Sequence, residues 1–455
     1  MKRIPLEQAL MALRRRPALD LQKRKRIAAQ RRRRGLSTES GERRDLFGPR
    51  SKVIGLLARH AFRSLAAQKR KITVKVPPVL SILDAPEDAI VLACSFARAL
   101  HEGKSIRTIT FHHQQLRKYD LAANALLDIV ASEFEAQFKI KRSRARLRFN
   151  GYLPNEASVQ RFIRAIGIIK HLGVEHEAPS EAEASQLEVF DSRQKHYSPK
   201  KKGTGAGKVD STARRFVDHI NKCLNTTKHE LTPDGLNSLT EYITEILNNA
   251  EEHPGFVDWT LQGYLDQSAP TPWCEIAIFN FGRSIAESLL QLPKPCYTWD
   301  QIGPYVEMHS GKRLFSPDWR EQDLTTVVAL QPDVSSKNRT VEDTRGQGTV
   351  DLIQFFQRVY EECTNAKNCA AEMAILSGST YIRFDGTHKL ASDEPGGRRK
   401  IAFNATNDLN ERPDPTFVRP LGKLHFPGTI ISIRFPLTSA TLVGESENGT
   451  ESDED

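Results

Sequence analysis

The clearest alternation of apolar and polar positions lies in residues 231–254 and predicts one amphipathic helix. Thr232 is expected to cap its N-terminus, Pro233 fits the first helical position, and Pro254 ends it. Apolar residues recur at helical spacing on one side: Leu236, Leu239, Ile243, Ile246, Leu247 and Ala250. Polar residues gather on the other side: Glu241, Glu245, Asn248, Asn249 and Glu252. The pattern alone fits an ordinary helix with a solvated acidic face.

Before this helix, patterns typical of strands alternate with patterns typical of helices, which predicts a small α/β domain over residues 72–190. Strands are expected at 72–76, 105–112 and 146–152, and helices at 89–101, 121–138 and 158–172. Residues 191–212 are rich in Lys, Gly and Ser and lose all periodicity, so they are predicted to be a linker.

After the helix, the pattern predicts a second and larger α+β domain over residues 213–440. Strands are expected at 273–280 and, as the closing strands of an antiparallel sheet, at 372–376, 381–384 and 430–435. Helices are expected at 286–290 and 350–360. Residues 291–344 lack steady periodicity, and residues 385–424 read as an insertion or long loop. Gly378 is expected to make a hairpin turn.

Charge is distributed unevenly along the chain. Residues 1–71 hold 22 Lys/Arg against 5 Asp/Glu, a net charge of +17; since the whole chain carries +10, residues 72–455 carry −7. This basic arm, expected to be partly disordered or to form short helices, could bind nucleic acid through phosphate groups, or remain solvated, or bind a partner protein. It has almost no aromatic residues on which bases would stack. The tail 441–455 is acidic and expected to be disordered.

No apolar run approaches the roughly 18 residues of a membrane span, and the N-terminus lacks the apolar core of a secretory signal. The six cysteines form no CxxC pair and have no zinc-site spacing. These features predict reduced thiols in a cytoplasmic protein without membrane contact.

One pair of residues on the predicted helix suggests chemistry. Glu245 and Asn249 are separated by one helical turn, so they lie about 5–6 Å apart on one face. The carboxylate could take a proton from an attacking water while the amide oxygen binds Mg²⁺.

Four segments in order resemble the motifs of the GHKL, or Bergerat-fold, ATPases, which include sensor histidine kinases and type II topoisomerases. Glu245-x-x-x-Asn249 is similar to the N-box, and Asn280-Phe-Gly282-Arg-Ser284 follows a strand as the adenine-binding box does. Arg345-Gly346-Gln-Gly348 stands before a helix, where glycines leave backbone N–H groups open to phosphate. The last motif of the family is similar to residues 428–437, where Gly428-Thr429 is followed by a strand and by Pro436-Leu437.

The resemblance implies a Bergerat-type α/β sandwich, with a mixed sheet layered with helices, that binds ATP and Mg²⁺. Glu245 would be the general base and Asn249 the Mg²⁺ ligand. Asn280, Gly282 and Thr429 would form the adenine pocket, while Arg345, Gly346 and Gly348 would hold the phosphate side under a mobile lid formed by residues 291–344. Two positions differ from the family motif: Asn280 replaces an Asp, and Ser284 replaces the second Gly.

Residues 72–190 resemble the STAS domains, small regulatory modules that bind partners, through the strand TITF and the segment RFNGYLPNEASVQRF. The two resemblances together imply a slow Mg²⁺-dependent ATPase, or a kinase that acts on a partner protein, and a homodimer is compatible with both. A non-catalytic adaptor of the same fold and a nucleic-acid-binding protein acting through residues 1–71 remain alternatives.

Overall fold

The fold was obtained as a computed structural model, which separates into two units, Met1–Pro49 and Arg50–Asp455. All residues described below belong to the second unit. They are 51–65, 67–68, 70–103, 106–141, 147–165, 187–194, 206–225, 229–252, 259–267, 272–310, 319–336, 338, 340, 347–365, 371–392, 397, 399–437 and 442–444.

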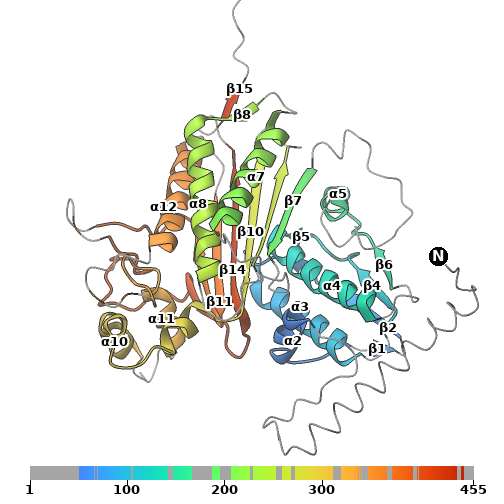
Figure 1. Cartoon of the computed structure of the whole chain (residues 1–455), viewed down its shortest axis with the longest axis horizontal. Helices are drawn as coiled ribbons and strands as arrows, with labels where there is room; N and C mark the ends of the chain where they lie inside the picture. Colours follow the sequence, from blue (N-terminus) through green and yellow to red (C-terminus); the bar gives the residue numbers. More distant parts are fainter. Residues whose placement is uncertain are drawn as a thin grey trace, which may run out of the picture. The chain divides into compact units, whose positions relative to one another are not determined.

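The N-terminal part of this unit is built on a four-stranded sheet in the order β1-β2-β4-β6 (Figure 1). Strands β2 (Lys71–Lys75), β4 (Thr108–His112) and β6 (Arg148–Tyr152) are parallel, and β1 (Ala67–Gln68) is antiparallel to β2. Three helices pack with this sheet: α2 (Lys52–Arg59), α3 (Pro86–Glu102) and α4 (Leu121–Lys141). The short strands β3 (Val79–Leu80) and β5 (Lys118–Tyr119) pair with each other, and α5 (Ala157–Ala165) follows β6.

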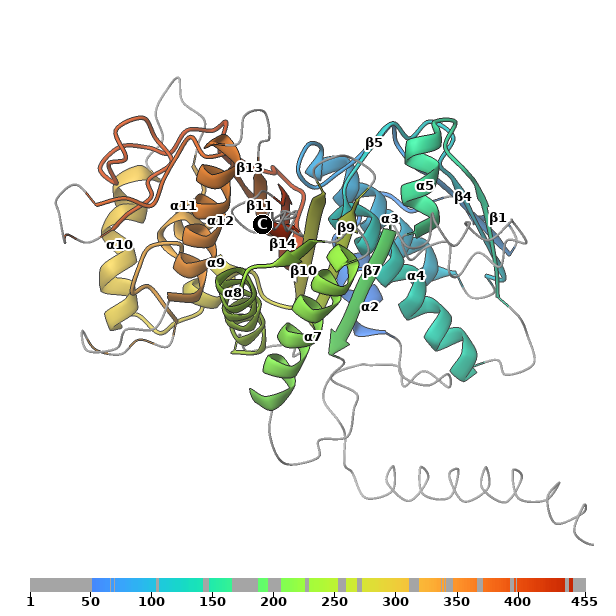
Figure 2. The same cartoon turned by 90° about the horizontal axis from the view of Figure 1, so that it is seen from above.

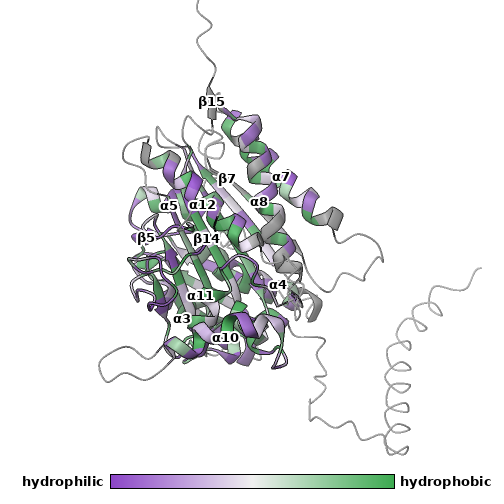
Figure 3. Cartoon of the chain, turned by 90° about the vertical axis from the view of Figure 1, so that its left-hand side faces the viewer, coloured by the Kyte–Doolittle hydropathy of each residue, from purple (hydrophilic) through white to green (hydrophobic). Residues whose placement is uncertain are grey.

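The C-terminal part is built on a seven-stranded sheet in the order β13-β12-β11-β14-β10-β9-β7. Its strands are β7 (Leu187–Gln194), β9 (Trp259–Asp266), β10 (Trp273–Phe281), β11 (Glu372–Gly378), β12 (Thr380–Phe384), β13 (Val418–Pro420) and β14 (Phe426–Pro436). Helices α7 (Ala206–Asn225), α8 (Pro233–Glu252) and α12 (Gln347–Asn365) cover one face, as Figure 2 shows from above. In Figure 3, hydrophobic residues run along β14, and α7 carries alternating hydrophobic and hydrophilic segments.

Helices α2 and α4 pack against the other face of this sheet, so the two parts share one hydrophobic core. The backbone N–H of Leu121, at the start of α4, donates to the buried Glu275 carboxylate on β10 over 2.8 Å. The Tyr381 hydroxyl on β12 donates to the Leu83 carbonyl over 2.7 Å. These contacts join elements that precede the predicted linker to strands that follow it, within a single unit.

Most elements expected from periodicity are present, with ends shifted by a few residues. The expected N-cap of α8 is confirmed, because Thr232 Oγ1 accepts the Gly235 N–H over 3.1 Å. Gly378 makes the expected turn between β11 and β12, with φ at +62°.

Four expectations of the sequence analysis need correction. The large sheet is antiparallel at every described pairing and not mixed. The predicted linker 191–212 contains the end of β7, which pairs with β9, and the start of α7. The tail predicted to be disordered contains β15 (Leu442–Gly444), which pairs with β8 (His229–Leu231).

The fourth correction concerns the segment predicted to be a mobile lid without clear elements. It contains α10 (Tyr297–His309) and α11 (Glu321–Val328), and α9 (Ile285–Leu290) precedes it. Residues 385–424, predicted to be an insertion or long loop, contain β13 and also contact this group, since the Gln331 side chain exchanges two hydrogen bonds with the backbone of the fully buried Ile401. Tertiary packing therefore orders a segment that has no helical periodicity. Within the described part of the chain, no helix has the length and apolar character needed to cross a membrane.

Candidate polar site at one end of the large sheet

Three strands of the large sheet carry aligned rows of side chains on the face that α8 and α12 cover. Strand register places Ile276, Ile433 and Met373 in one row and Ile278, Ile431 and Ile375 in the next. The third row is Asn280, Thr429 and Ser377, so the apolar surface becomes polar at the end of β10 and the start of β14. We call these three residues the polar row.

Two glycines let the backbone turn closely around this row. Gly282 and Gly428 have φ of +133° and +134°, values that side-chain-bearing residues rarely adopt. A Cβ at Gly428 would lie 1.9 Å from the Asn280 carbonyl oxygen, so only glycine fits there. The Gly282 N–H donates to the Pro427 carbonyl over 3.0 Å and closes the turn.

Ser377 joins the three structural elements that meet at the polar row. Its hydroxyl lies 2.8 Å from the Thr429 hydroxyl and accepts the Ile285 N–H, at the start of α9, over 2.8 Å. Ser377 accepts from this amide and still has one proton and one lone pair, so either hydroxyl can be the donor between Ser377 and Thr429. Ser377 thus fixes the orientation of the Thr429 side chain.

Ser284 does not continue the glycine turn but begins a helix. Its side chain accepts the Glu287 N–H, and the Glu287 carboxylate accepts the Ser284 N–H, which is a complete capping box for α9. The other Glu287 oxygen lies 3.6 Å from His425 Nε2. The His425 ring centroid lies 4.4 Å from that of His60, at the end of α2, with the two ring planes tilted by 31°. Burial lowers the pKa of both histidines below the usual value.

The N-terminal end of helix α12 lies on the side of the polar row. Near its other end, the Cys363 thiol contacts the Pro436 carbonyl, at the far end of β14. The Phe356 ring lies 6.1 Å from the Phe384 ring. Phe384 pairs with Met373, and Met373 pairs with Ile433, so Phe356 lies at the level of Ile433 on β14. Gly348 precedes Phe356 by eight residues, or about 12 Å, and Thr429 precedes Ile433 by four strand residues, about 13 Å. The N-terminus of α12 is therefore level with the polar row.

Helix α8 runs in the opposite direction to α12 and reaches the same end of the sheet. It begins just after β8, which pairs with β15 beyond the end of β14. Midway along it, the Tyr242 ring lies 4.5 Å from Phe355 on α12. Positions 245 and 249 follow one and two turns later, on the approach to the polar row.

The facing turns of α8 and α12 bring two acids together. Burial, and then the nearby charge of Glu241, raises the pKa of Asp351 above the usual value for an aspartate. Asp351 lies three residues after Gly348, so this acidic pair borders the first turn of α12.

The residues predicted from the four motifs thus fall into two groups. The structure brings Asn280, Gly282 and Thr429 together, and it places the helical backbone of Glu245, Asn249 and Gly348 at the same end of the sheet. The side chains of Glu245 and Asn249, and all of Arg345 and Gly346, lie outside the described residues.

Sequence reasoning missed Ser377 and the role of Ser284. The spacing Ser284-x-x-Glu287 before an apolar run is a capping-box signal that could have identified the second. No local pattern marks Ser377, because its role depends on strand register.

Comparison with protein-family models, with curated proteins and with solved structures finds no match to this chain.

Proposed function

We propose that the chain binds ATP with Mg²⁺ at the polar row, as a GHKL-type module of Bergerat fold, and that its nucleotide state controls a protein partner. The observation that carries the proposal is the convergence of four separate segments on one end of the large sheet. These are the end of β10, the start of β14, the N-terminus of α12 and the second half of α8.

The chemistry of these groups suits a nucleotide. The hydroxyl of Thr429 and the amide of Asn280 are polar groups at the edge of an apolar surface, where a base would gain both burial and hydrogen bonds. The first N–H groups of an α-helix have no partner within the helix, so the N-terminus of α12 suits phosphate oxygens through these donors and through its dipole. Asn249 would supply an oxygen ligand to Mg²⁺, and the metal would neutralise phosphate charge.

In this proposal Glu245 is the general base that accepts a proton from an attacking water or hydroxyl group. Slow ATP hydrolysis and phosphorylation of a partner protein are the two reactions that such a base supports. The STAS-like part that precedes β7 contacts the large sheet, because the Leu121 N–H donates to Glu275 on β10, and this contact supports an exchange of signals between the two parts.

The direct test is to compare purified wild type with Glu245→Ala and Asn249→Ala. Glu245→Ala is expected to bind ATP with unchanged affinity and to lose turnover, measured as phosphate release or transfer of labelled phosphate. Asn249→Ala is expected to lose the Mg²⁺-dependent part of ATP binding. Asp234→Ala, at the far end of α8, is the matched control and keeps both. Equal turnover in wild type and Glu245→Ala would remove the catalytic assignment.

A non-catalytic adaptor of the same fold is the second candidate, and Asn280 favours it. A neutral amide oxygen accepts a hydrogen bond from a base more weakly than a carboxylate does. A thermal melting assay separates the two candidates, because a ligand present at 100 times its Kd adds about 2.7 kcal/mol to stability. An adaptor that does not bind ATP would give no shift.

A further inference from the structure

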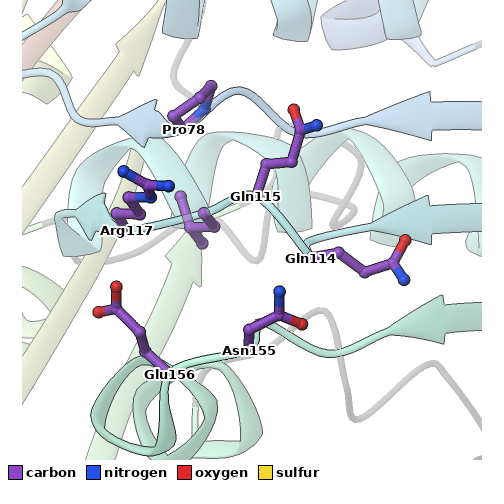
Figure 4. A pocket seen from close by; sticks show the side chains of 7 residues that line it. Pro78, Gln114, Gln115, Arg117, Asn155 and Glu156 are labelled. Atoms are coloured by element: carbon purple, nitrogen blue, oxygen red, sulfur yellow. The ribbon is translucent and has the colours of Figure 1, made fainter.

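A separate cavity lies outside the polar row, at the carboxyl ends of the parallel strands β2, β4 and β6. Its volume is about 520 Å³, within the usual range for small-molecule sites. It is lined by Pro78, Gln114, Gln115, Leu116, Arg117, Asn155 and Glu156 (Figure 4). The loops after parallel strands are where open α/β sheets commonly bind ligands.

Backbone hydrogen bonds fix the loops that form this cavity. The Arg117 and Lys118 N–H groups both donate to the Pro78 carbonyl, over 2.8 and 3.1 Å. The His113 N–H donates to the Tyr152 carbonyl over 2.9 Å, which ties the loop after β4 to the end of β6. Leu116 is only 1% exposed and provides an apolar floor. These bonds tie the loop after β4 to both the loop after β2 and the end of β6.

Opposite charges border the cavity without neutralising each other. Arg117 and Glu156 lie on its two sides at one end in Figure 4, yet no ion pair joins these two side chains in the described structure. The carboxamides of Gln114, Gln115 and Asn155 occupy the remaining rim. Each carboxamide can both donate and accept hydrogen bonds.

We propose that this cavity binds a small zwitterion of the α-amino-acid class, a free amino acid or a dipeptide with a polar side chain. The Arg117 guanidinium would hold the carboxylate, for which its forked donors are suited. The Glu156 carboxylate would hold the ammonium group, and the three carboxamides would bind the polar side chain. A nucleotide fits less well, because none of the described residues that line the cavity is aromatic and because one cation faces one anion.

The test is a binding screen on the full chain, by thermal melting and then calorimetry, with the twenty amino acids and a set of polar dipeptides. At least one zwitterion is expected to bind, while its N-acetyl and C-terminal amide derivatives bind at least tenfold more weakly. Binding by none of these probes at 10 mM (about 100 times a Kd of 0.1 mM), or equal binding of the blocked derivatives, would overturn the proposal.

Variants locate the binding and separate it from loss of folding. Arg117→Gln and Glu156→Gln are each expected to weaken binding at least tenfold with an unchanged melting temperature in the absence of ligand. The matched control Arg148→Gln changes an exposed arginine on β6 outside the cavity and keeps wild-type affinity. Wild-type affinity in both cavity variants would place the ligand elsewhere and contradict the assignment.

Discussion

At the scale of single residues, Ser377 orients the Thr429 side chain in the candidate nucleotide site. The Ser377 hydroxyl accepts the Ile285 N–H, and its proton and its second lone pair remain for other partners. Thr429 Oγ1 at 2.8 Å is a better acceptor position than the Gly428 carbonyl at 3.5 Å. The 2.8 Å hydrogen bond joins the two hydroxyls, either of which can be the donor, and it holds the Thr429 side chain in one orientation for a ligand.

Ser377→Ala should weaken ATP binding by about 2–10-fold, the net contribution of one hydrogen bond. Calorimetric titration of ATP measures this loss. In a Thr429→Val background the same substitution should have no further effect, because Ser377 acts through Thr429. Additive losses in the double variant would show that Ser377 has only a general structural role.

Gly428 should be the least replaceable glycine of the site. Its positive φ strains any side chain, and the added Cβ would collide with the Asn280 carbonyl, which is backbone and cannot move aside. Gly428→Ala should therefore lower the free energy of unfolding by at least about 3 kcal/mol, measured by urea denaturation.

Gly422 is the matched control for this substitution. It also has a positive φ, of +60°, but a Cβ there meets no atom within 4 Å. Gly422→Ala should lower the free energy of unfolding by only about 1 kcal/mol, the strain alone. Similar losses for both variants would refute the close approach of β14 to β10.

At the scale of elements, Glu275 links α4 to the large sheet and makes this contact depend on pH. Burial raises the pKa of Glu275 from 4.5 to about 7, although the nearby Arg434 opposes the shift. Between pH 4.5 and about 7, Glu275 is therefore protonated in the folded state and ionised in the unfolded chain. Its stabilising effect is complete below about pH 4.5 and is lost as the pH rises through 7.

The free energy of unfolding should accordingly fall between pH 5 and 8, by up to roughly 3 kcal/mol from this residue. Glu275→Gln keeps an acceptor for the Leu121 N–H and cannot ionise, so its stability should depend less on pH over this range. Urea denaturation of both proteins at several pH values measures the difference. Parallel pH profiles would exclude Glu275 as the titrating group.

The elements that the sequence predicted well are those with a local signal. α8 has a cap, a broad apolar face and a terminating proline, and β10 alternates along its length, so both were found to within two residues. Elements without such signals were missed. His309 at the end of α10 contacts the Leu409 carbonyl over 2.9 Å, and Gln331 just after α11 bonds to the backbone of Ile401. β7 becomes a strand because β9 lies beside it.

The residues of the candidate site also divide into those with a local sequence signal and those without one. Asn280, Gly282 and Thr429 were predicted from ordered motifs, and antiparallel register then made Asn280 and Thr429 direct neighbours. Ser377 comes from a third strand, and only the pairing of β11 with β14 brings it to Thr429. Long-range register of this kind is not encoded in any local spacing.

At the scale of the whole molecule, the boundary of the folded unit lies within the region predicted to be a basic arm. Ser51 caps α2, and Leu57 on this helix is fully buried in the core shared with α3 and α4. The strongly basic segment up to Pro49 belongs to the other unit. The arm and the start of the core are thus adjacent in sequence.

Two truncations should separate these roles. Removal of residues 1–49 should leave the melting temperature unchanged, whereas removal of residues 1–71 should lower it strongly or prevent folding, because the buried face of α2 is lost. If the arm contacts nucleic acid, the shorter truncation should also abolish salt-dependent binding to duplex or single-stranded probes. Equal stability of the two truncated proteins would contradict the inclusion of α2 in the core.

The account as a whole depends on a nucleotide lying across the polar row, and a structure with a non-hydrolysable ATP analogue and Mg²⁺ tests this most directly. We expect the base beside Asn280 and Thr429, the phosphates at the N-terminus of α12, and the side chains of Glu245 and Asn249 directed at the phosphates and metal. An analogue bound elsewhere, or Glu245 and Asn249 directed into solvent away from the polar row, would contradict it.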